Sequence, residues 1–250
     1  MSLVAVVGDR TSTTAIGLVG AWPRAHERVL VELDPSGGCA AAWLGTPRQP
    51  GLSDVVASGD PGRLDAIDQH IQRTPSGLAV LVAPVRPAEC GAVVAAATPM
   101  LPVMSAHEWV FVADVGRVGG TLPPAVAQAG VVVVSHVQHA GSPAAAALGM
   151  ERLADRCALL TMRSLPTIVA LHGTVPYGID EVRTFLGVST VVAIADDPWA
   201  AAVIAGRPGS PRRLRRSAWW ASVERLSDAV AAEVGDALHG HPLLGWQRHG

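Results

Sequence analysis

The stretch that follows the first apolar run of the sequence has residue types that can hold a phosphate group. Residues 3–7 (LVAVV) are apolar, and Gly8 and Arg10 lie between this run and a series of hydroxyl residues that ends with Thr13 and Thr14. Phosphate loops combine closely approaching backbone amides, a positive charge and a hydroxyl that reaches magnesium. Gly8, Arg10, Thr13 and Thr14 are therefore the candidate residues of a phosphate-binding loop.

The same stretch lacks other groups that such a loop needs. All 19 basic residues of the chain are arginine, so no lysine exists to contact the phosphates. Gly8 is the only glycine between the apolar run and Thr13, and Asp9 adds a negative charge beside the place where phosphates would lie. We therefore expect no ATP binding of the usual kind and no cofactor. One of the hydroxyl residues is expected to be the N-cap of the following helix.

Two carboxylates follow predicted strands and are candidates for chemistry or for turns. Asp34 precedes Pro35 after the run 28–33, and Asp114 opens an Asp-x-Gly sequence after the run 109–113. Both are also ordinary turn sequences, because aspartate bonds to nearby backbone amides. We treat Asp34 and Asp114 as vestigial candidates, and we expect no catalytic residue.

Other catalytic and metal-binding classes find little support in the sequence. Cys39, Cys90 and Cys157 show no C-x-x-C spacing, and neither G-x-S-x-G nor G-x-G-x-x-G occurs. His136, His139 and His172 lie near predicted loops, but their spacing is too loose for a metal site. No metal is predicted.

A basic cluster precedes the last predicted helix. It consists of Arg212, Arg213, Arg215 and Arg216. Trp219 and Trp220 then begin an apolar face with helical spacing, so the helix is expected to pack on the sheet while the arginines stay in solvent. Since adjacent helix positions are about 100° apart, one of the two tryptophans is expected to stay exposed as a partner contact beside the arginines.

Apolar runs of strand length alternate with helical patterns along the chain. Strands are predicted at 3–7, 28–33, 78–83, 109–113, 131–135, 166–171 and 190–194. Helices are predicted at 12–21, 51–58, 64–73, 88–98, 142–160, 179–186, 199–205 and 217–237. This alternation predicts an α/β fold with a doubly wound, mostly parallel sheet and helices on both faces. Gly8, Asp34, Asp114 and Ser135 would then lie at one edge, where such sheets bind ligands.

Composition indicates a single globular domain of ordinary to large size. The chain has 250 residues, is 49% hydrophobic and carries a formal net charge of −2. We expect one domain over residues 1–238 and a flexible tail over 239–250. No run has the length of a membrane helix, so we expect a cytoplasmic protein, with a position at the inner membrane face as the alternative.

An ordered set of segments resembles a known family. The segments are VAVVGDR, RVLVELDPSGG, GLSDVV, GLAVLVAPVRPAE, WVFVADVGRVGG, AGVVVVSHVQHAGSPAAAALGMERL and VVAIADDPWAAAVIAGRPG. Together they resemble the ParA and MinD group of deviant P-loop ATPases, and within it the TadZ, CpaE and septum-site-determining proteins.

The resemblance implies roles for single positions. Arg10 would stand in the place of the family's signature lysine and Thr13 in that of its magnesium-binding hydroxyl. Asp34 matches the aspartate that positions the attacking water, and Asp114 matches the Walker B aspartate. His172 stands where active members have an asparagine that reads adenine.

The expected function is that of a degenerate, catalytically inactive ParA/MinD-like protein. It would act as an interaction scaffold in placing a pilus or secretion machine or the division site, with a protein of that system as partner and with any homodimer independent of ATP. Two alternatives stay open. One is a weak ATPase that uses Asp34, Asp114 and Thr13 with an arginine in place of lysine. The other is a DNA or anionic-membrane adaptor that works through the arginine cluster.

Overall fold

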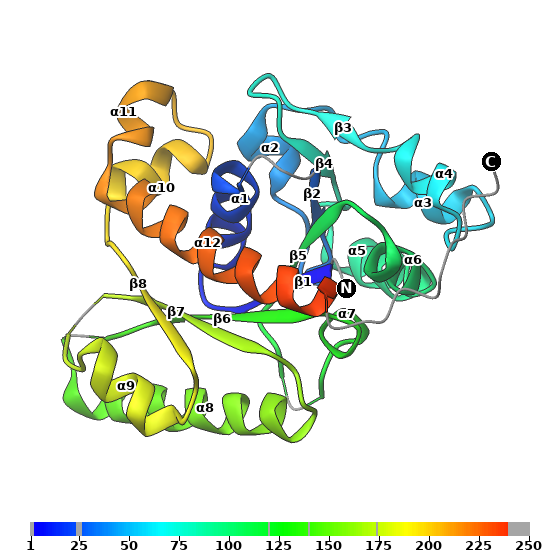
Figure 1. Cartoon of the computed structure of the whole chain (residues 1–250). Coiled ribbons are helices and arrows are strands. Elements are labelled where there is room, and N and C mark those ends of the chain that lie inside the picture. Colours follow the sequence, from blue (N-terminus) through cyan, green and yellow to red (C-terminus); the bar gives the residue numbers. More distant parts are fainter. Residues whose placement is uncertain (1–2, 24–26, 120, 140, 174, 240–250) are drawn as a thin grey trace, which may run out of the picture.

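The computed structural model describes residues 3–23, 27–119, 121–139, 141–173 and 175–239. These residues form an eight-stranded sheet in the order β3-β4-β2-β5-β1-β6-β7-β8 (Figure 1). The strands are β1 Leu3–Gly8, β2 Arg28–Glu32, β3 Gln72–Arg73, β4 Ala79–Leu81, β5 Val110–Gly116, β6 Val131–Val137, β7 Thr167–His172 and β8 Thr190–Ile194. All neighbouring strands are parallel except the antiparallel pair β3 and β4, so the predicted doubly wound α/β fold is confirmed.

Helices cover both faces of this sheet, which is why its central strands are continuous apolar runs. On one face α1 Thr11–Ala21, α2 Ala40–Leu44, α10 Pro198–Ile204 and α12 Ala218–His239 enclose one core, and α11 Pro211–Arg215 lies beside α12. On the other face lie α3 Leu52–Ala57, α4 Leu64–Asp68, α5 Pro87–Ala96, α6 Met100–Ala106, α7 Pro124–Ala127, α8 Pro143–Met162 and α9 Ile179–Leu186. The sheet therefore separates two cores.

Among the described residues no single helix is long and apolar enough to cross a membrane; α5 and α6 together reach that length but are bent by 63°.

One predicted helix is too long. The prediction over 64–73 is wrong beyond Asp68, because Gln72 and Arg73 form β3 and pair with β4. The turn between these two strands explains the change: the Thr74 amide donates to the Leu78 carbonyl, the Leu78 amide donates to Thr74 Oγ1, and Gly77 has φ +84°. A tight hairpin therefore replaces the last helical turns.

The last helix packs both of its tryptophans, so the prediction of one exposed ring is wrong. Trp219 is 3% exposed and Trp220 9%. Two glycines of α1 make the space, because a Cβ on Gly17 would lie 2.8 Å from Trp219 Cη2 and one on Gly20 would lie 3.1 Å from Trp220 Cη2. Adjacent tryptophans are buried because α1 lets both rings approach its backbone.

The carboxyl edge of the sheet brings the predicted site residues together. Gly8 of β1 is in register with Ser135 of β6, Glu32 of β2 is in register with Asp114 of β5, and His172 ends β7. At the end of the chain α12 reaches His239. The predicted tail spans 239–250: its first residue, His239, ends α12, and residues 240–250 lie outside the described residues, so the division at 238/239 stays a prediction.

Candidate functional site

A hollow of about 470 Å³ opens at the carboxyl ends of β1, β2 and β5. Four of the predicted residues line it: Gly8, Arg10, Thr13 and Asp34. Four further lining residues are absent from the sequence predictions: Ser36, Trp43, Gly116 and Arg117. The last two lie two and three residues after Asp114, at the end of β5, and that position was the available signal for them.

The turn from β1 to α1 is short and closed against β6. Only Asp9 and Arg10 separate the strand from the helix. Gly8 has φ +110°, and a Cβ there would lie 2.1 Å from the Ser135 carbonyl oxygen, so this position requires glycine. The Asp9 amide donates to that same carbonyl at 2.8 Å. The amide that follows the strand is thus already bonded within the protein.

The hydroxyls at the start of α1 have different partners from those predicted. Thr13 Oγ1 and Thr14 Oγ1 donate to the Arg10 carbonyl at 2.9 and 3.0 Å, while Ser12 Oγ donates to Asp114 Oδ2 at 2.6 Å. The hydroxyl beside Asp114 is therefore that of Ser12 and not that of Thr13. The N-cap is Arg10, with φ 51° and no side-chain cap, so the prediction of a hydroxyl cap is wrong.

The two predicted carboxylates lie within the protein's own hydrogen bonds. Asp114 is 3% exposed, and burial raises the pKa of its carboxyl, an effect that the Ser12 hydrogen bond opposes. Asp34 Oδ1 accepts the Ser36 amide at 2.8 Å. The Asp34 carboxylate packs on Gly116, where φ is +72° and a Cβ would lie 2.2 Å from Asp34 Cγ. Asp34 thus bonds within the turn that follows β2, while Asp114 lies within β5 and accepts the Gly116 amide at 3.2 Å.

Charged side chains close the edge of the hollow. Arg10 Nη1 lies 3.1 Å from Asp196 Oδ1, which follows β8. Asp9 Oδ1 lies 3.5 Å from Arg117 Nε, and Asp9 Oδ2 accepts the Val137 amide at 3.3 Å. The one arginine of the turn thus faces a carboxylate of this chain. Asp196 was not predicted, although its place after a strand resembles that of Asp34.

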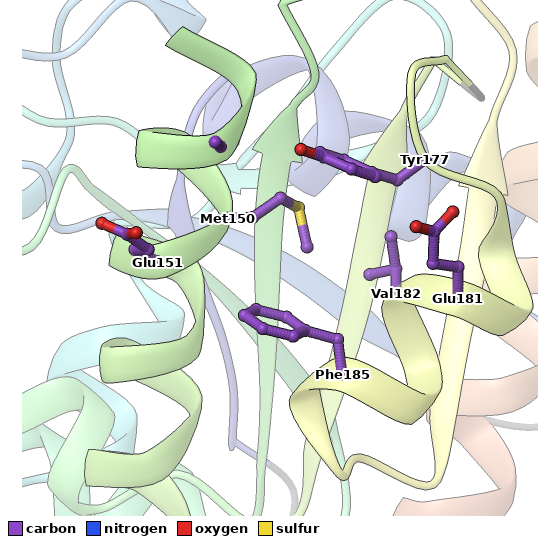
Figure 2. Close-up of a pocket in the computed structure, with 7 residues that line it drawn as sticks. Met150, Glu151, Tyr177, Glu181, Val182 and Phe185 are labelled. Atoms are coloured by element: carbon purple, nitrogen blue, oxygen red, sulfur yellow. The ribbon is translucent and has the colours of Figure 1, made fainter. Parts of the chain in front are cut away.

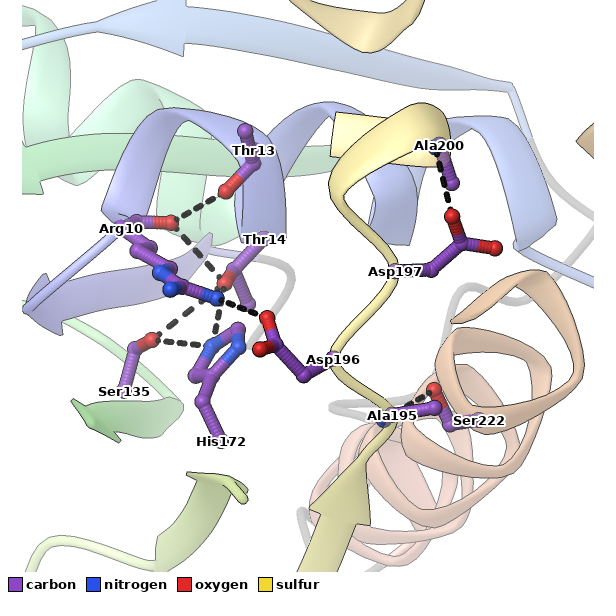
Figure 3. Close-up of polar contacts among 10 residues, drawn as sticks. All are labelled: Arg10, Thr13, Thr14, Ser135, His172, Ala195, Asp196, Asp197, Ala200 and Ser222. Carbon is purple, nitrogen blue, oxygen red and sulfur yellow. Dashed lines mark hydrogen bonds and ion pairs between the residues drawn. The ribbon is translucent and has the colours of Figure 1, made fainter. Parts of the chain in front are cut away.

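A buried polar cluster lies beneath Arg10 (Figure 3). His172 Nε2 lies 3.0 Å from Ser135 Oγ and 3.4 Å from Thr14 Oγ1, and Thr14 is turned into this cluster rather than into the hollow. His172 is 3% exposed, and burial, helped by the charge of Arg10, lowers its pKa to about 4. Within the described residues His172 Nδ1 has no hydrogen-bond partner. The cluster holds a neutral imidazole in the interior.

These residues do not fit a magnesium triphosphate held as a P-loop holds it. A P-loop places four residues, a glycine and a lysine between its first glycine and its Ser or Thr, and the lysine directly precedes the hydroxyl. Here three residues separate Gly8 from Ser12, and the buried Thr11 precedes it. Asp9 adds negative charge, and Arg10 faces Asp196. The turn has neither the length nor the charge of a phosphate loop.

The predicted basic cluster lies at the surface, in α11 and directly after it. Arg212, Arg213 and Arg216 line a hollow of about 420 Å³, and Arg213 Cζ lies 4.2 Å from the centroid of the Trp199 ring. In the part of the chain that the structure describes, none of the four arginines has a carboxylate within 4.0 Å. Asp197 also lines this hollow, where it accepts the Ala200 amide, so the cluster presents a net positive charge without an ion pair, whereas the neighbouring Trp219 and Trp220 are core residues.

The chain has the architecture of P-loop nucleotide-binding proteins. The features that define it are the parallel sheet, the turn at the end of β1 and the acidic residues at the ends of β2 and β5. Solved structures specify this architecture further. A ParA family ATPase from Chlorobium tepidum TLS is 15% identical, with 91% of this chain and 99% of that chain covered at a TM-score of 0.68. MinD of the MinC:MinD cell division complex of Aquifex aeolicus is 12% identical, with both chains covered completely at a TM-score of 0.69.

A third structure agrees with these two. The septum site-determining protein MinD from Pyrococcus horikoshii OT3, complexed with Mg-ADP, is 15% identical, with 95% and 96% of the two chains covered at a TM-score of 0.66. No protein-family profile and no curated protein matches the sequence. The chain has the ParA/MinD-type fold, as the resemblance implied.

Proposed function

We propose that this protein uses the ParA/MinD-type fold without nucleotide hydrolysis, as an interaction scaffold in placing a pilus or secretion machine or the division site. The observation that carries the proposal is the two-residue turn between β1 and α1, whose arginine faces Asp196. A helix start can attract anions, but a triphosphate also needs surrounding amides and a free cation.

The proposed partner is a protein of that localisation, pilus, secretion or division system, and the proposed location is the cytoplasm, at the inner membrane face where the partner requires it. Similar folds support a protein partner, since MinD of Aquifex aeolicus occurs in a complex with MinC. Loss of nucleotide chemistry leaves the surface of the fold as the part that can be used for recognition.

Titration calorimetry with ATP and magnesium tests the proposal. We expect no heat beyond dilution and no release of phosphate. A dissociation constant in the low micromolar range contradicts it and favours the weak ATPase that uses Asp34, Asp114 and a hydroxyl. In that case Arg10→Gln should abolish the activity, whereas Arg163→Gln, at the exposed C-terminal end of α8, should keep it.

A second candidate function rests on the net positive charge of the arginine cluster at α11. Arginines at a protein surface attract the phosphates of DNA or of anionic lipids, and such binding weakens with salt. Binding to duplex DNA and to phosphatidylserine vesicles, measured at several salt concentrations, tests it. Replacement of the four arginines by glutamine should remove the binding, and a binding strength that salt leaves unchanged contradicts this function.

A further inference from the structure

A separate hollow of about 250 Å³ lies between α8 and α9, on the face of the sheet opposite α11 (Figure 2). Its floor is apolar, two aromatic rings form part of its wall, and a carboxylate stands on each helix. The floor is Met150 and Val182, the rings are those of Tyr177 and Phe185, and the carboxylates are those of Glu151 and Glu181. Phe185 is 57% exposed, which is unusual for so large an apolar ring.

The size and lining of this hollow fit an arginine side chain. Pockets for small molecules usually measure about 300–1,000 Å³, so this hollow is better matched to one side chain of a protein. An arginine places its apolar stem on an apolar floor, stacks its planar guanidinium on aromatic rings and bonds to carboxylates. The hollow between α8 and α9 offers all three surfaces together.

The two carboxylates are available to such a partner. Within the described residues, neither Glu151 nor Glu181 has an arginine or histidine within 4.0 Å. Arg183, the arginine of α9, pairs with Asp180 at 2.7 Å. The negative charge at the hollow is therefore not neutralised from within the chain.

The chain itself carries the matching element. The five residues of α11 contain three arginines, a fourth follows directly, and all four are exposed. Arg213 lies over Trp199, which leaves Arg212, Arg215 and Arg216 without a described partner. The two surfaces carry opposite charge, and each also contains exposed or half-buried apolar groups, such as Leu214 beside the arginines.

The two surfaces cannot meet within one copy of the chain. Met150 and Val182 of the hollow belong to the core on one face of the sheet, and Leu214 of α11 packs on the core of the other face. Figure 1 shows α8 and α9 on one side of the strands and α11 on the other. Contact between the surfaces therefore requires a second molecule.

We propose that copies of this chain associate head to tail, with an arginine of α11 from one copy seated in the α8–α9 hollow of the next, against Phe185 and beside Glu181, with Glu151 adding negative charge at the rim. Such an interface joins two different surfaces, so it continues into a ring or a filament rather than stopping at a symmetric dimer. The proposal does not depend on whether the chain hydrolyses ATP.

Sedimentation velocity of the full chain tests the proposal. The mean sedimentation coefficient should rise with protein concentration at low salt, fall towards the monomer value at high salt, and be the same with and without ATP. A monomer at every concentration in low salt overturns the proposal and leaves arginine-rich segments of other proteins as occupants of the hollow. Assembly that appears only with ATP also overturns it.

Two variants, each with the charges of one surface removed, test the surfaces one at a time. One carries Glu151→Gln, Glu181→Gln and Phe185→Ala; the other carries glutamine at the four arginine positions of α11. Each variant alone should be monomeric, and an equal mixture should form dimers but nothing larger, because each retains one working surface. Assembly of either variant alone, or the absence of dimers in the mixture, overturns a head-to-tail contact.

Controls separate this contact from general effects of charge and folding. Asp68→Asn, Glu89→Gln and Val85→Ala together remove two exposed carboxylates and one exposed apolar side chain elsewhere, and this variant should assemble like the wild type. Circular dichroism confirms that each variant is folded, and Phe185→Ala alone serves if a multiple variant is not. Lysine at the four arginine positions keeps the charge but loses the planar fork, so assembly should weaken; unchanged assembly overturns the arginine pocket.

Discussion

Ser12 Oγ donates a 2.6 Å hydrogen bond to Asp114 Oδ2, and this bond joins the first turn of α1 to β5 across 102 residues of sequence. Asp114 is almost fully buried, so its carboxylate depends on protein donors. The Gly116 amide supplies a second donor at 3.2 Å. Two protein donors therefore hold the Asp114 carboxylate, one from α1 and one from β5 itself.

We expect Ser12→Ala to lower the free energy of unfolding by about 1.5–3 kcal/mol, because the buried carboxylate loses a charge-assisted hydrogen bond. Thr13→Ala removes a bond to the Arg10 carbonyl from an exposed site and should cost about 1 kcal/mol or less. Urea denaturation at neutral pH measures both. An equal decrease in the free energy of unfolding in the two variants would show that the hydrogen bond to Asp114 stabilises the protein no more than the one to the Arg10 carbonyl.

Protonation of His172 should make stability depend on pH. Its pKa is about 4 in the folded chain and 6.5 when unperturbed, so between these values the unfolded chain binds a proton that the folded chain does not. The free energy of unfolding should therefore fall as the pH falls from 6.5 towards 4, by on the order of 3 kcal/mol in all. His172→Asn removes this titration.

The measurement is the difference in unfolding free energy between the wild type and His172→Asn at a series of pH values. This difference cancels the opposite trend from Asp114, whose pKa is raised by burial. We expect it to change most between pH 6.5 and 4, and parallel pH curves for the two proteins would refute a neutral buried imidazole.

Gly17→Ala should destabilise the protein although alanine favours helices. The added Cβ would lie 2.8 Å from Trp219 Cη2 and 2.9 Å from Val223 Cγ1, in a core that cannot expand freely. Overpacking costs about 1–3 kcal/mol, against a helix-propensity gain of at most about 1 kcal/mol. Gly91→Ala in α5 is the control, because its Cβ would make ordinary contacts at 3.8–3.9 Å and should stabilise slightly. Thermal unfolding measures whether each variant is less or more stable than the wild type.

The final helix should be structural and the arginine cluster dispensable for folding. Six apolar residues of α12 are buried against α1 and the sheet: Trp219, Trp220, Val223, Leu226, Val230 and Val234. Each large side chain contributes about 1.5–3 kcal/mol by burial. Deletion from Ser217 onward should therefore abolish soluble expression. Glutamine at the four arginines should leave the melting temperature nearly unchanged, and a truncated chain that folds normally would make α12 an appendage.

Local sequence pattern determined the fold class and the edge at which the site lies. The continuous Val, Leu and Ala runs at 3–7 and 131–135 became buried parallel strands, and the pattern at 179–186 became α9 with the predicted bounds. Gly8 ends β1, and Asp34 and Asp114 lie within two residues of the ends of β2 and β5, so their common edge follows from parallel strand direction alone. Such features depend on neighbours a few residues apart, which a sequence displays directly.

Only the tertiary structure decided which of these residues touch one another. Ser12 rather than Thr13 bonds to Asp114, Arg10 faces Asp196, and both tryptophans of α12 are buried because Gly17 and Gly20 lie opposite them. The α8–α9 hollow likewise joins residues of two helices that no single motif links. These contacts join positions far apart in the chain. Periodicity fixes which face of an element is apolar, but the element packed against that face decides the partners.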